Sequence, residues 1–111
     1  MRAIGTFKKL RTLRITSPAV TDAGAAALAR VNTLAFLTLE RTSIGDDSAG
    51  VIADLSNLTE LHLSRTKITD AGLAKFKTLK KLKVLSLRGT SITAEAAAEF
   101  QKNMPQCRVE Y

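Results

Sequence analysis

The sequence repeats itself every 24 residues, and this period constrains the fold more than any other feature of the chain. Four apolar columns keep the step through four consecutive units without an insertion. Their members are Leu10, Leu34, Leu58 and Leu82; Leu13, Leu37, Leu61 and Leu85; Ile15, Leu39, Leu63 and Leu87; and Val20, Ile44, Ile68 and Ile92. A fixed period of this length is typical of a solenoid, in which each unit buries its apolar face only by stacking on its neighbours.

The hydrophobic period changes halfway through each unit. The first half begins L-x-x-L-x-L, and its last two apolar positions alternate with others, as a short strand with one buried face requires. A polar turn follows, where a threonine hydroxyl can bond to backbone groups that no strand ladder reaches. This column holds Pro18 in the first unit and then Thr42, Thr66 and Thr90. We therefore expect one strand and one polar turn per unit.

The second half of each unit has the chemistry of a helix start. Thr21, Gly45, Thr69 and Thr93 are expected to cap the first amides, and the acidic residues that follow suit the positive end of a helix dipole. Apolar residues then recur three apart, which predicts short helices of two to three turns. They are Ala25, Leu28 and Val31; Ala49, Ile52 and Leu55; Leu73, Phe76 and Leu79; and Ala97 and Phe100.

We interpret residues 1–111 as a single domain, since the chain is too short for two separate cores. Within it, the four repeats span residues 10–33, 34–57, 58–81 and 82–105. Residues 1–9 are interpreted as a partial N-terminal cap and residues 106–111 as a closing strand.

Both ends of the chain support this division. Ile4 and Phe7 align with the apolar helix positions of the later units, so the N-terminal segment looks like the end of a preceding helix. At the other end Cys107, Val109 and Tyr111 alternate, and the last two align with the leucines of the strand column. A fifth strand is therefore expected to complete the sheet.

Cys107 is the only cysteine, so the chain can form no intramolecular disulfide and no cysteine-based metal cluster. We interpret it as a buried small hydrophobe and not as a reactive thiol. With one histidine and one cysteine, no metal or cofactor is expected. Neither a signal peptide nor the ~20 apolar residues of a membrane span is evident. We expect a cytoplasmic protein, unless the chain is cut from a longer secreted one.

The stretch L-x-x-L-x-L-x-x-T-x-I-T-D-A-G-L, from Leu58 to Leu73, resembles the leucine-rich repeats of the ribonuclease-inhibitor-like superfamily. The 24-residue step and the helix start at Ile44 look most like the GALA-type bacterial subclass. The resemblance implies an α/β solenoid, a right-handed coil with a parallel β-sheet on the concave side and short helices on the convex side. It also implies protein partners, which such arrays commonly hold. The chain has threonines where many such repeats carry asparagine, and it has no F-box, so neither an asparagine ladder nor a ubiquitin-ligase role is expected.

If the leucines point inward, the residues between them project from the concave sheet, in columns whose neighbours are about 4.8 Å apart. Phe36 and Val84 are candidate anchors for a partner, because each is apolar on an otherwise polar face. Scattered surface hydrophobes are the ordinary alternative. The mixed charges around them suit a protein or peptide better than a uniform polyanion, although solvated strand faces have the same composition. The candidate partner-binding residues are Arg14, Phe36, Thr38, Glu40, Glu60, His62, Val84, Ser86 and Arg88.

His62 and Ser86 fall on neighbouring strands, with Glu60 or Glu110 nearby, in a superficial likeness to a base and its nucleophile. An open sheet offers no oxyanion hole, no nucleophile elbow and no enclosed pocket that would exclude water. We therefore interpret the chain as a binding module and not as an enzyme.

Positive charge is in excess, with 17 Lys and Arg residues against 10 Asp and Glu residues and a net charge of +7. Such charge could bind nucleic acid, an anionic membrane surface or an acidic partner, but no nucleic-acid-binding motif accompanies it and aromatic residues are few. A solvated surface is the ordinary alternative. A third hypothesis is a structural array, or a piece of a longer repeat protein, that self-associates through its thinly capped first repeat. Part of the excess is predicted to form a basic rim: Lys75, Lys77, Lys80, Lys81 and Lys83.

Overall fold

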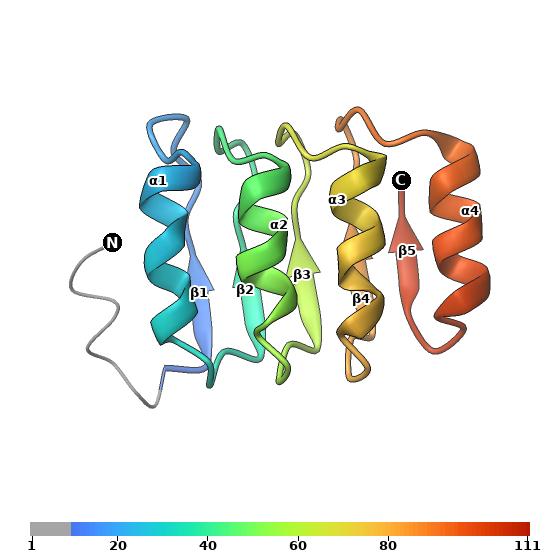
Figure 1. The fold of residues 1–111 in the computed structure, drawn as a ribbon, viewed down its shortest axis with the longest axis horizontal. Helices are drawn as coiled ribbons and strands as arrows, with labels where there is room; N and C mark the ends of the chain where they lie inside the picture. The colour runs from blue at the N-terminus through green and yellow to red at the C-terminus, as the bar shows by residue number, and fades with distance from the viewer. Residues whose placement is uncertain (1–9) are drawn as a thin grey trace.

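The computed structural model describes residues 10–111 as two layers, a five-stranded sheet and a row of short helices that covers one of its faces (Figure 1). All four strand pairs are parallel, and the strands lie in chain order across the sheet. They are β1 (Thr12–Arg14), β2 (Phe36–Thr38), β3 (Glu60–His62), β4 (Val84–Ser86) and β5 (Arg108–Glu110). This arrangement confirms the α/β solenoid that the repeat predicts.

Each connection between neighbouring strands contains one helix, and the helices lie side by side on the same face of the sheet (Figure 1). They are α1 (Asp22–Ala25), α2 (Asp46–Ala53), α3 (Asp70–Lys75) and α4 (Ala94–Asn103). The first and third continue as tighter 3-10 turns, η2 (Ala26–Arg30) and η3 (Phe76–Thr78). α4 ends at Asn103, just before Met104-Pro105, because the residue that precedes a proline disfavours the helical conformation.

The strands pair in the register that the leucine columns predict. Leu13 lies opposite Leu37, Leu37 opposite Leu61, Leu61 opposite Leu85, and Leu85 opposite Val109. A slip of one residue would turn every one of these side chains to the other face of the sheet. The repeat step therefore fixes which residues enter the core and which remain outside.

The core lies between the sheet and the helices and consists of the predicted apolar columns. Leu37, Leu61 and Leu85 are fully buried, whereas Leu13 in the first repeat is only half-buried. β1 is an edge strand of the sheet, so within the described residues its leucine has a neighbouring repeat on one side only. The predicted partial cap at residues 1–9 lies outside the described residues.

The threonine column performs the role that the sequence predicts for it. The hydroxyls of Thr42, Thr66 and Thr90 each donate to the backbone carbonyl three residues earlier, at 2.7, 2.8 and 2.7 Å. These carbonyls lie where the strand turns toward the helix layer, and Thr42 and Thr66 are themselves buried. The hydroxyl therefore satisfies a backbone acceptor at a position where water has little access.

The prediction that each helix is capped by its own first residue is wrong for three of the four helices. Only Thr93 accepts a hydrogen bond from an amide of its own helix, that of Ala96. The side chains at Thr21 and Thr69 form no such cap, and Gly45 has no side chain to form one.

At three of the four helix starts, two of which lack a cap of their own, an aspartate of the preceding repeat supplies an acceptor. The carboxylates of Asp22, Asp46 and Asp70 each accept the backbone amide at the start of the next repeat's helix, at 2.8 Å in all three cases. These bonds form an aspartate ladder that crosses the helix layer from repeat to repeat. Each carboxylate therefore satisfies an amide that the next helix leaves without an internal partner.

Each carboxylate of the aspartate ladder also accepts one hydroxyl, but from different positions in different repeats. Gly45 offers no hydroxyl at the start of the second repeat, and Ser48 donates to Asp22 in its place. In the third repeat Thr69 donates directly to Asp46, and the fourth repeat follows the same arrangement. The next repeat thus always supplies both an amide and a hydroxyl.

The C-terminal strand closes the sheet as predicted, but its last residue does not follow the column. Cys107 is 1% exposed, and burial raises the pKa of its thiol to about 11, which fits a buried hydrophobe. Tyr111 aligns with the buried Leu87 and yet is 59% exposed. β5 ends at Glu110, so Tyr111 lies outside the strand whose alternation it continues in the sequence.

We predict that Asp46→Ala lowers the free energy of unfolding by about 1 to 2 kcal/mol, because the amide and hydroxyl of Thr69 lose their acceptor. Asp47→Ala is the matched control, since Asp47 is exposed on the same helix and accepts none of the described hydrogen bonds. Its expected cost is below about 1 kcal/mol, from the helix dipole alone. Urea unfolding of both variants measures the difference, and equal losses would contradict the aspartate ladder.

A second prediction concerns acid. Burial raises the pKa of Asp22, but hydrogen bonds from the Gly45 amide and from Ser48 lower it more, so the pKa lies below its ordinary value. A lowered pKa contributes stability above the unfolded-state pKa of about 3.9 and loses it as the pH falls through the folded-state value. We expect the stability difference between the wild type and Asp22→Asn to be largest near neutral pH and to shrink in acid. A difference that grows in acid would contradict this role.

Candidate functional site

The sheet face turned away from the helices, which we call the open face, carries the residues between the inward-pointing leucines. The predicted columns are neighbours in the observed register: the row from Arg14 through Thr38, His62 and Ser86 to Glu110, and beside it the row from Thr12 to Arg108. The register therefore places the candidate binding residues on one continuous surface. Their role in binding stays a prediction.

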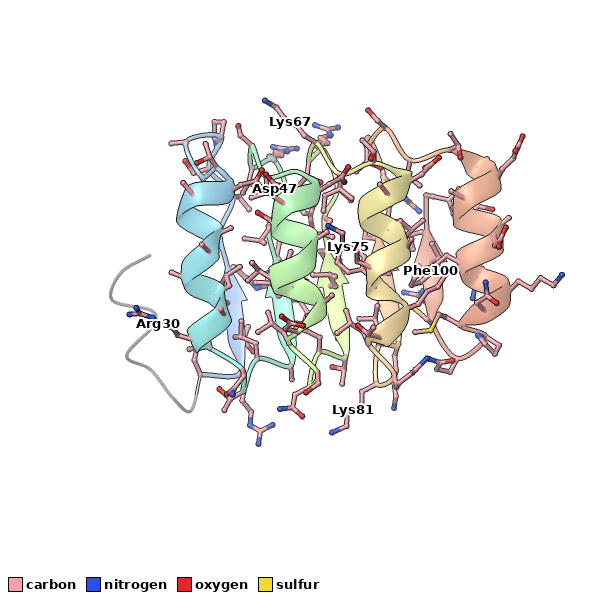
Figure 2. The ribbon with its side chains drawn as sticks, in the orientation of Figure 1. Arg30, Asp47, Lys67, Lys75, Lys81 and Phe100 are labelled. Carbon is pink, nitrogen blue, oxygen red and sulfur yellow. The ribbon has the colours of Figure 1, made fainter. Side chains whose placement is uncertain are left out.

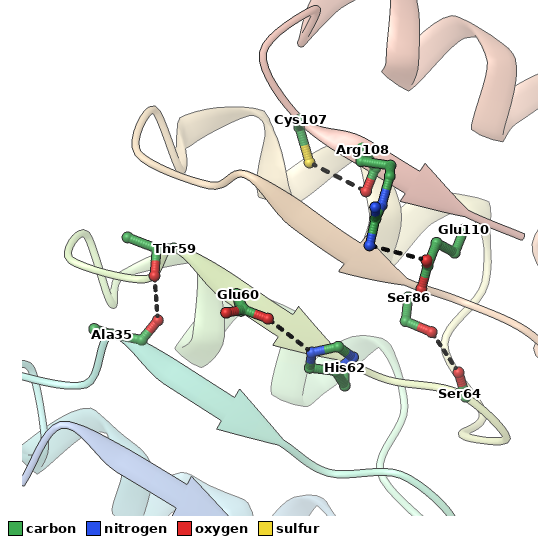
Figure 3. A network of polar contacts seen from close by, with 9 residues as sticks. All are labelled: Ala35, Thr59, Glu60, His62, Ser64, Ser86, Cys107, Arg108 and Glu110. Atoms are coloured by element: carbon green, nitrogen blue, oxygen red, sulfur yellow. Dashed lines mark hydrogen bonds and ion pairs between the residues drawn. The ribbon is translucent and has the colours of Figure 1, made fainter.

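A chain of side-chain contacts crosses three strands of the open face. The Arg14 guanidinium lies over the Phe36 ring, 5.1 Å from its centroid, and the Phe36 ring packs against His62 with centroids 5.2 Å apart. His62 Nε2 lies 3.4 Å from Glu60 Oε1, as Figure 3 shows. We call these four residues the aromatic row. Cation–π and ring contacts of this kind hold an aromatic side chain in one orientation on the surface.

Two of the predicted contact residues are largely covered by their neighbours on the sheet. Thr38 is 7% exposed and Ser86 is 6% exposed, although both point to the open face. Their short side chains lie between longer ones, such as Phe36 and His62, on neighbouring positions of the sheet. They therefore form part of the floor of the open face, and their role in binding stays a prediction.

The structure does not pair His62 with Ser86. The Ser86 hydroxyl bonds to the Ser64 hydroxyl at 2.8 Å, while the His62 ring meets Glu60 (Figure 3). A second polar pair, between Arg108 and Glu110 at 3.3 Å, lies on β5. Within residues 10–111 the serine and the histidine are thus engaged separately, without the contact that a nucleophile and its base need.

A shallow hollow of about 460 Å³ lies where the strands of the open face end. We call it the strand-end hollow. It contains three arginines, two glutamates and the serine pair just described, and two of the arginines were missed by sequence reasoning. Its lining residues are Glu40, Arg41, His62, Ser64, Arg65, Ser86, Arg88, Gly89 and Glu110.

Arg41 and Arg65 reach the strand-end hollow because their backbones are left-handed, with φ of 60° and 59°. The aligned position in the fourth repeat is Gly89, with φ of 75°. For a residue with a Cβ, this conformation costs about 1 to 2 kcal/mol. In the sequence, only Gly89 indicates this backbone conformation. A glycine aligned with two arginines suggests that the position favours φ above zero.

The predicted basic rim divides between two parts of the molecule. Lys75 lies in the helix layer between α2 and α3, where its Nζ donates to the Asp46 carbonyl at 3.2 Å (Figure 2). Lys80, Lys81 and Lys83 are exposed in the turn that leads into β4, and Lys81 donates to Asn57 at 3.2 Å. Lys77 is half-buried on η3.

Two further features are absent from the part of the chain that the structure describes. No three His, Cys, Asp or Glu side chains of residues 10–111 converge as they would around a metal ion. The same residues contain no helix of the length and apolarity that crossing a membrane needs.

Comparison with known sequences agrees with the repeat architecture. A family model for leucine-rich repeats matches residues 8–29 and 54–77, which include most of the first and third repeats. The matched segments are leucine-rich repeats, and residues 10–111 have a leucine-rich-repeat fold. Assignment of the chain to the GALA-type subclass stays a prediction. Among curated protein sequences, none matches it significantly.

Solved structures of other proteins superpose on nearly the whole chain. Leiomodin-1 actin-binding site 2 matches with a TM-score of 0.77 and 18% identity, over 99% of this chain and 75% of that one. An internalin C2 of Listeria monocytogenes matches with a TM-score of 0.70 and 21% identity, over 96% of this chain and 54% of that one. A leucine-rich-repeat protein of Leptospira interrogans matches with a TM-score of 0.61 and 18% identity, over 100% and 33%. At these identities the likeness establishes the fold alone.

We predict that Gly89→Ala destabilises this leucine-rich-repeat domain by about 1 to 2 kcal/mol. Alanine would have to adopt the left-handed backbone of Gly89, and its Cβ would lie 2.9 Å from Arg65 Cγ. Gly50→Ala is the matched control, because Gly50 lies within α2 with only Lys75 Nζ near its Cβ position, and alanine there should stabilise by about 0.5 to 1 kcal/mol. Thermal unfolding that ranks the two variants in the opposite order would contradict the assigned backbone geometry.

Proposed function

We propose that this leucine-rich-repeat domain is a protein-binding scaffold that holds a folded protein or a peptide against its open face. The observation that carries the proposal is the aromatic row, in which Phe36 is fixed between Arg14 and His62 and is only half-buried. An aromatic side chain that is already ordered loses little conformational freedom when it is buried by a partner. Such side chains are the usual anchors of protein interfaces.

The chemistry around the aromatic row suits a protein surface. Val84 is half-exposed on β4, and Glu60 lies between it and Phe36 in the register, so two apolar side chains flank one carboxylate. Charges of both signs continue along the same face at Arg88 and Glu110. An apolar centre with a mixed polar surround is the usual composition of a protein interface, whereas a polyanion would favour uniform positive charge.

The relatives in structure support the same general use of the fold. The leiomodin-1 structure is named as an actin-binding site, and this chain superposes on 75% of it. The likeness lies in the fold at 18% identity, so it supports a protein partner in general and does not assign actin to this chain. Catalysis is not proposed, because Ser86 bonds to Ser64 and His62 to Glu60, which leaves no nucleophile beside a base among the described residues.

We predict that Phe36→Ala combined with Val84→Ser weakens partner binding at least about tenfold, because truncating anchors at an interface centre costs about 2 kcal/mol or more. The measurement compares proteins captured from a cell lysate by the wild type and by the variant, followed by binding titrations with each captured protein. Circular dichroism and thermal unfolding establish that the double variant is folded.

Glu99→Ala with Lys102→Ala is the matched control, because both residues are exposed on α4 in the helix layer. This control should capture the same proteins as the wild type. If the open-face variant binds these proteins as tightly as the wild type, the proposed use of the open face is refuted.

A further inference from the structure

The strand-end hollow concentrates positive charge that the chain itself does not neutralise. Arg41, Arg65 and Arg88 line it, and none of the ion pairs found among the described residues involves any of them. Their guanidinium groups also take part in none of the hydrogen bonds found in that part of the chain. Three guanidiniums around one hollow thus retain donors for an outside group.

The floor of the strand-end hollow offers a further donor. The hydroxyls of Ser64 and Ser86 bond to each other at 2.8 Å, and both residues are less than a tenth exposed. Since two hydroxyls carry two protons and their mutual bond uses one, a second proton can be donated to a group seated above them. The hollow therefore combines charged donors at its sides with a neutral donor at its floor.

The backbone gives an independent reason to assign a role to the arginine side chains. Arg41 and Arg65 adopt the left-handed conformation at a position where the fourth repeat has a glycine, which needs no strain to adopt it. Neither guanidinium makes a described bond within the chain that would offset this strain. Strain that no internal contact offsets is typical of residues held for binding.

The two glutamates select among anions. Glu40 and Glu110 line the same hollow as the three arginines, and Glu110 also pairs with Arg108 at 3.3 Å, so the two carboxylates lower the positive charge of the hollow without cancelling it. A group with a single negative charge meets less repulsion from these glutamates than a doubly charged phosphate does. The planar fork of an arginine also fits a carboxylate with two parallel hydrogen bonds.

We propose that the strand-end hollow binds the carboxylate of an aspartate or glutamate side chain of the partner protein. This proposal rests on the proposed function, because it places the partner on the open face, and it adds the chemistry by which that partner is recognised. The aromatic row supplies the apolar anchor, and the strand-end hollow, which shares His62 with it, receives an acidic residue of the same partner.

The test uses a fluorescein-labelled peptide of alternating glutamate and glycine with neutral ends, titrated with the full chain and followed by fluorescence anisotropy. Arg41→Gly with Arg65→Gly should weaken binding at least about tenfold, since each substitution removes a charge-assisted hydrogen-bond donor. Glycine suits the left-handed backbone at both positions, so the variant is expected to fold, and thermal unfolding checks this.

Lys80→Gly with Lys81→Gly is the matched control, because it removes the same two charges from exposed residues of the turn before β4. Its affinity for the peptide should stay within about twofold of the wild type. Equal weakening by both double variants would mean that the peptide responds to net charge alone, and would overturn the proposal. Absence of binding to the wild type, or tighter binding of the matching phosphoserine peptide, would also overturn it.

Failure of the carboxylate site can be distinguished from failure of the proposed scaffold function. Phe36→Ala with Val84→Ser leaves the three arginines in place, so it should reduce capture of the partner while keeping most of the affinity for the glutamate peptide. If capture of the partner depends on Phe36 and Val84, but the affinity for the peptide does not depend on Arg41 and Arg65, the carboxylate site is refuted and the open-face scaffold stands. If capture is indifferent to Phe36 and Val84, the scaffold proposal fails whatever the peptide does.

Discussion

The stacking of each repeat on its neighbours is the interaction on which the rest of the structure depends. One repeat contributes a strand of three residues and a short helix, and neither can bury its apolar side chains alone. Two rows of bonds reinforce the stack: strand pairing along the sheet and the aspartate ladder along the helix starts. Because both rows connect adjacent repeats, every repeat is positioned by the one before it, and the side chains of the open face inherit that spacing.

Much of the fold could be predicted from the sequence because side-chain direction in a strand has period two and the repeat has a fixed step. Leu37, Leu61 and Leu85 identify the strands, their register and the buried face together. The capping pattern could not be predicted in the same way. Asp46 accepts the amide of Thr69, 23 residues later at the start of the next repeat's helix, and no local motif relates the two residues. Sequence rules for caps describe neighbours along the chain and do not cover an acceptor supplied from another repeat.

The candidate site was predicted in part. The columns placed Phe36 beside Glu60 and His62 beside Ser86, as the register has them. A column of aligned residues does not give the relative sizes of neighbouring side chains. It therefore could not predict that Ser86 is covered by the side chains around it. Nor does it express backbone conformation, which brings Arg41 and Arg65 to the hollow. Apolar periodicity reports on the core, while the open face depends on turns and on side-chain length.

In each contact of the aspartate ladder the hydroxyl comes from the repeat that follows the aspartate, and it belongs to Ser48, Thr69 or Thr93. A repeat with its own aspartate therefore contributes to the contacts on both of its sides. Its carboxylate accepts hydrogen bonds from the next repeat, and its amide and hydroxyl donate to the carboxylate of the repeat before it. Internal repeats of this kind are interchangeable in principle. Duplicating one of them within the gene would lengthen the array, and the contacts between adjacent repeats would stay the same. The open face would then widen by one strand with each added repeat, and a larger partner could be accommodated by duplication before any single contact had been refined.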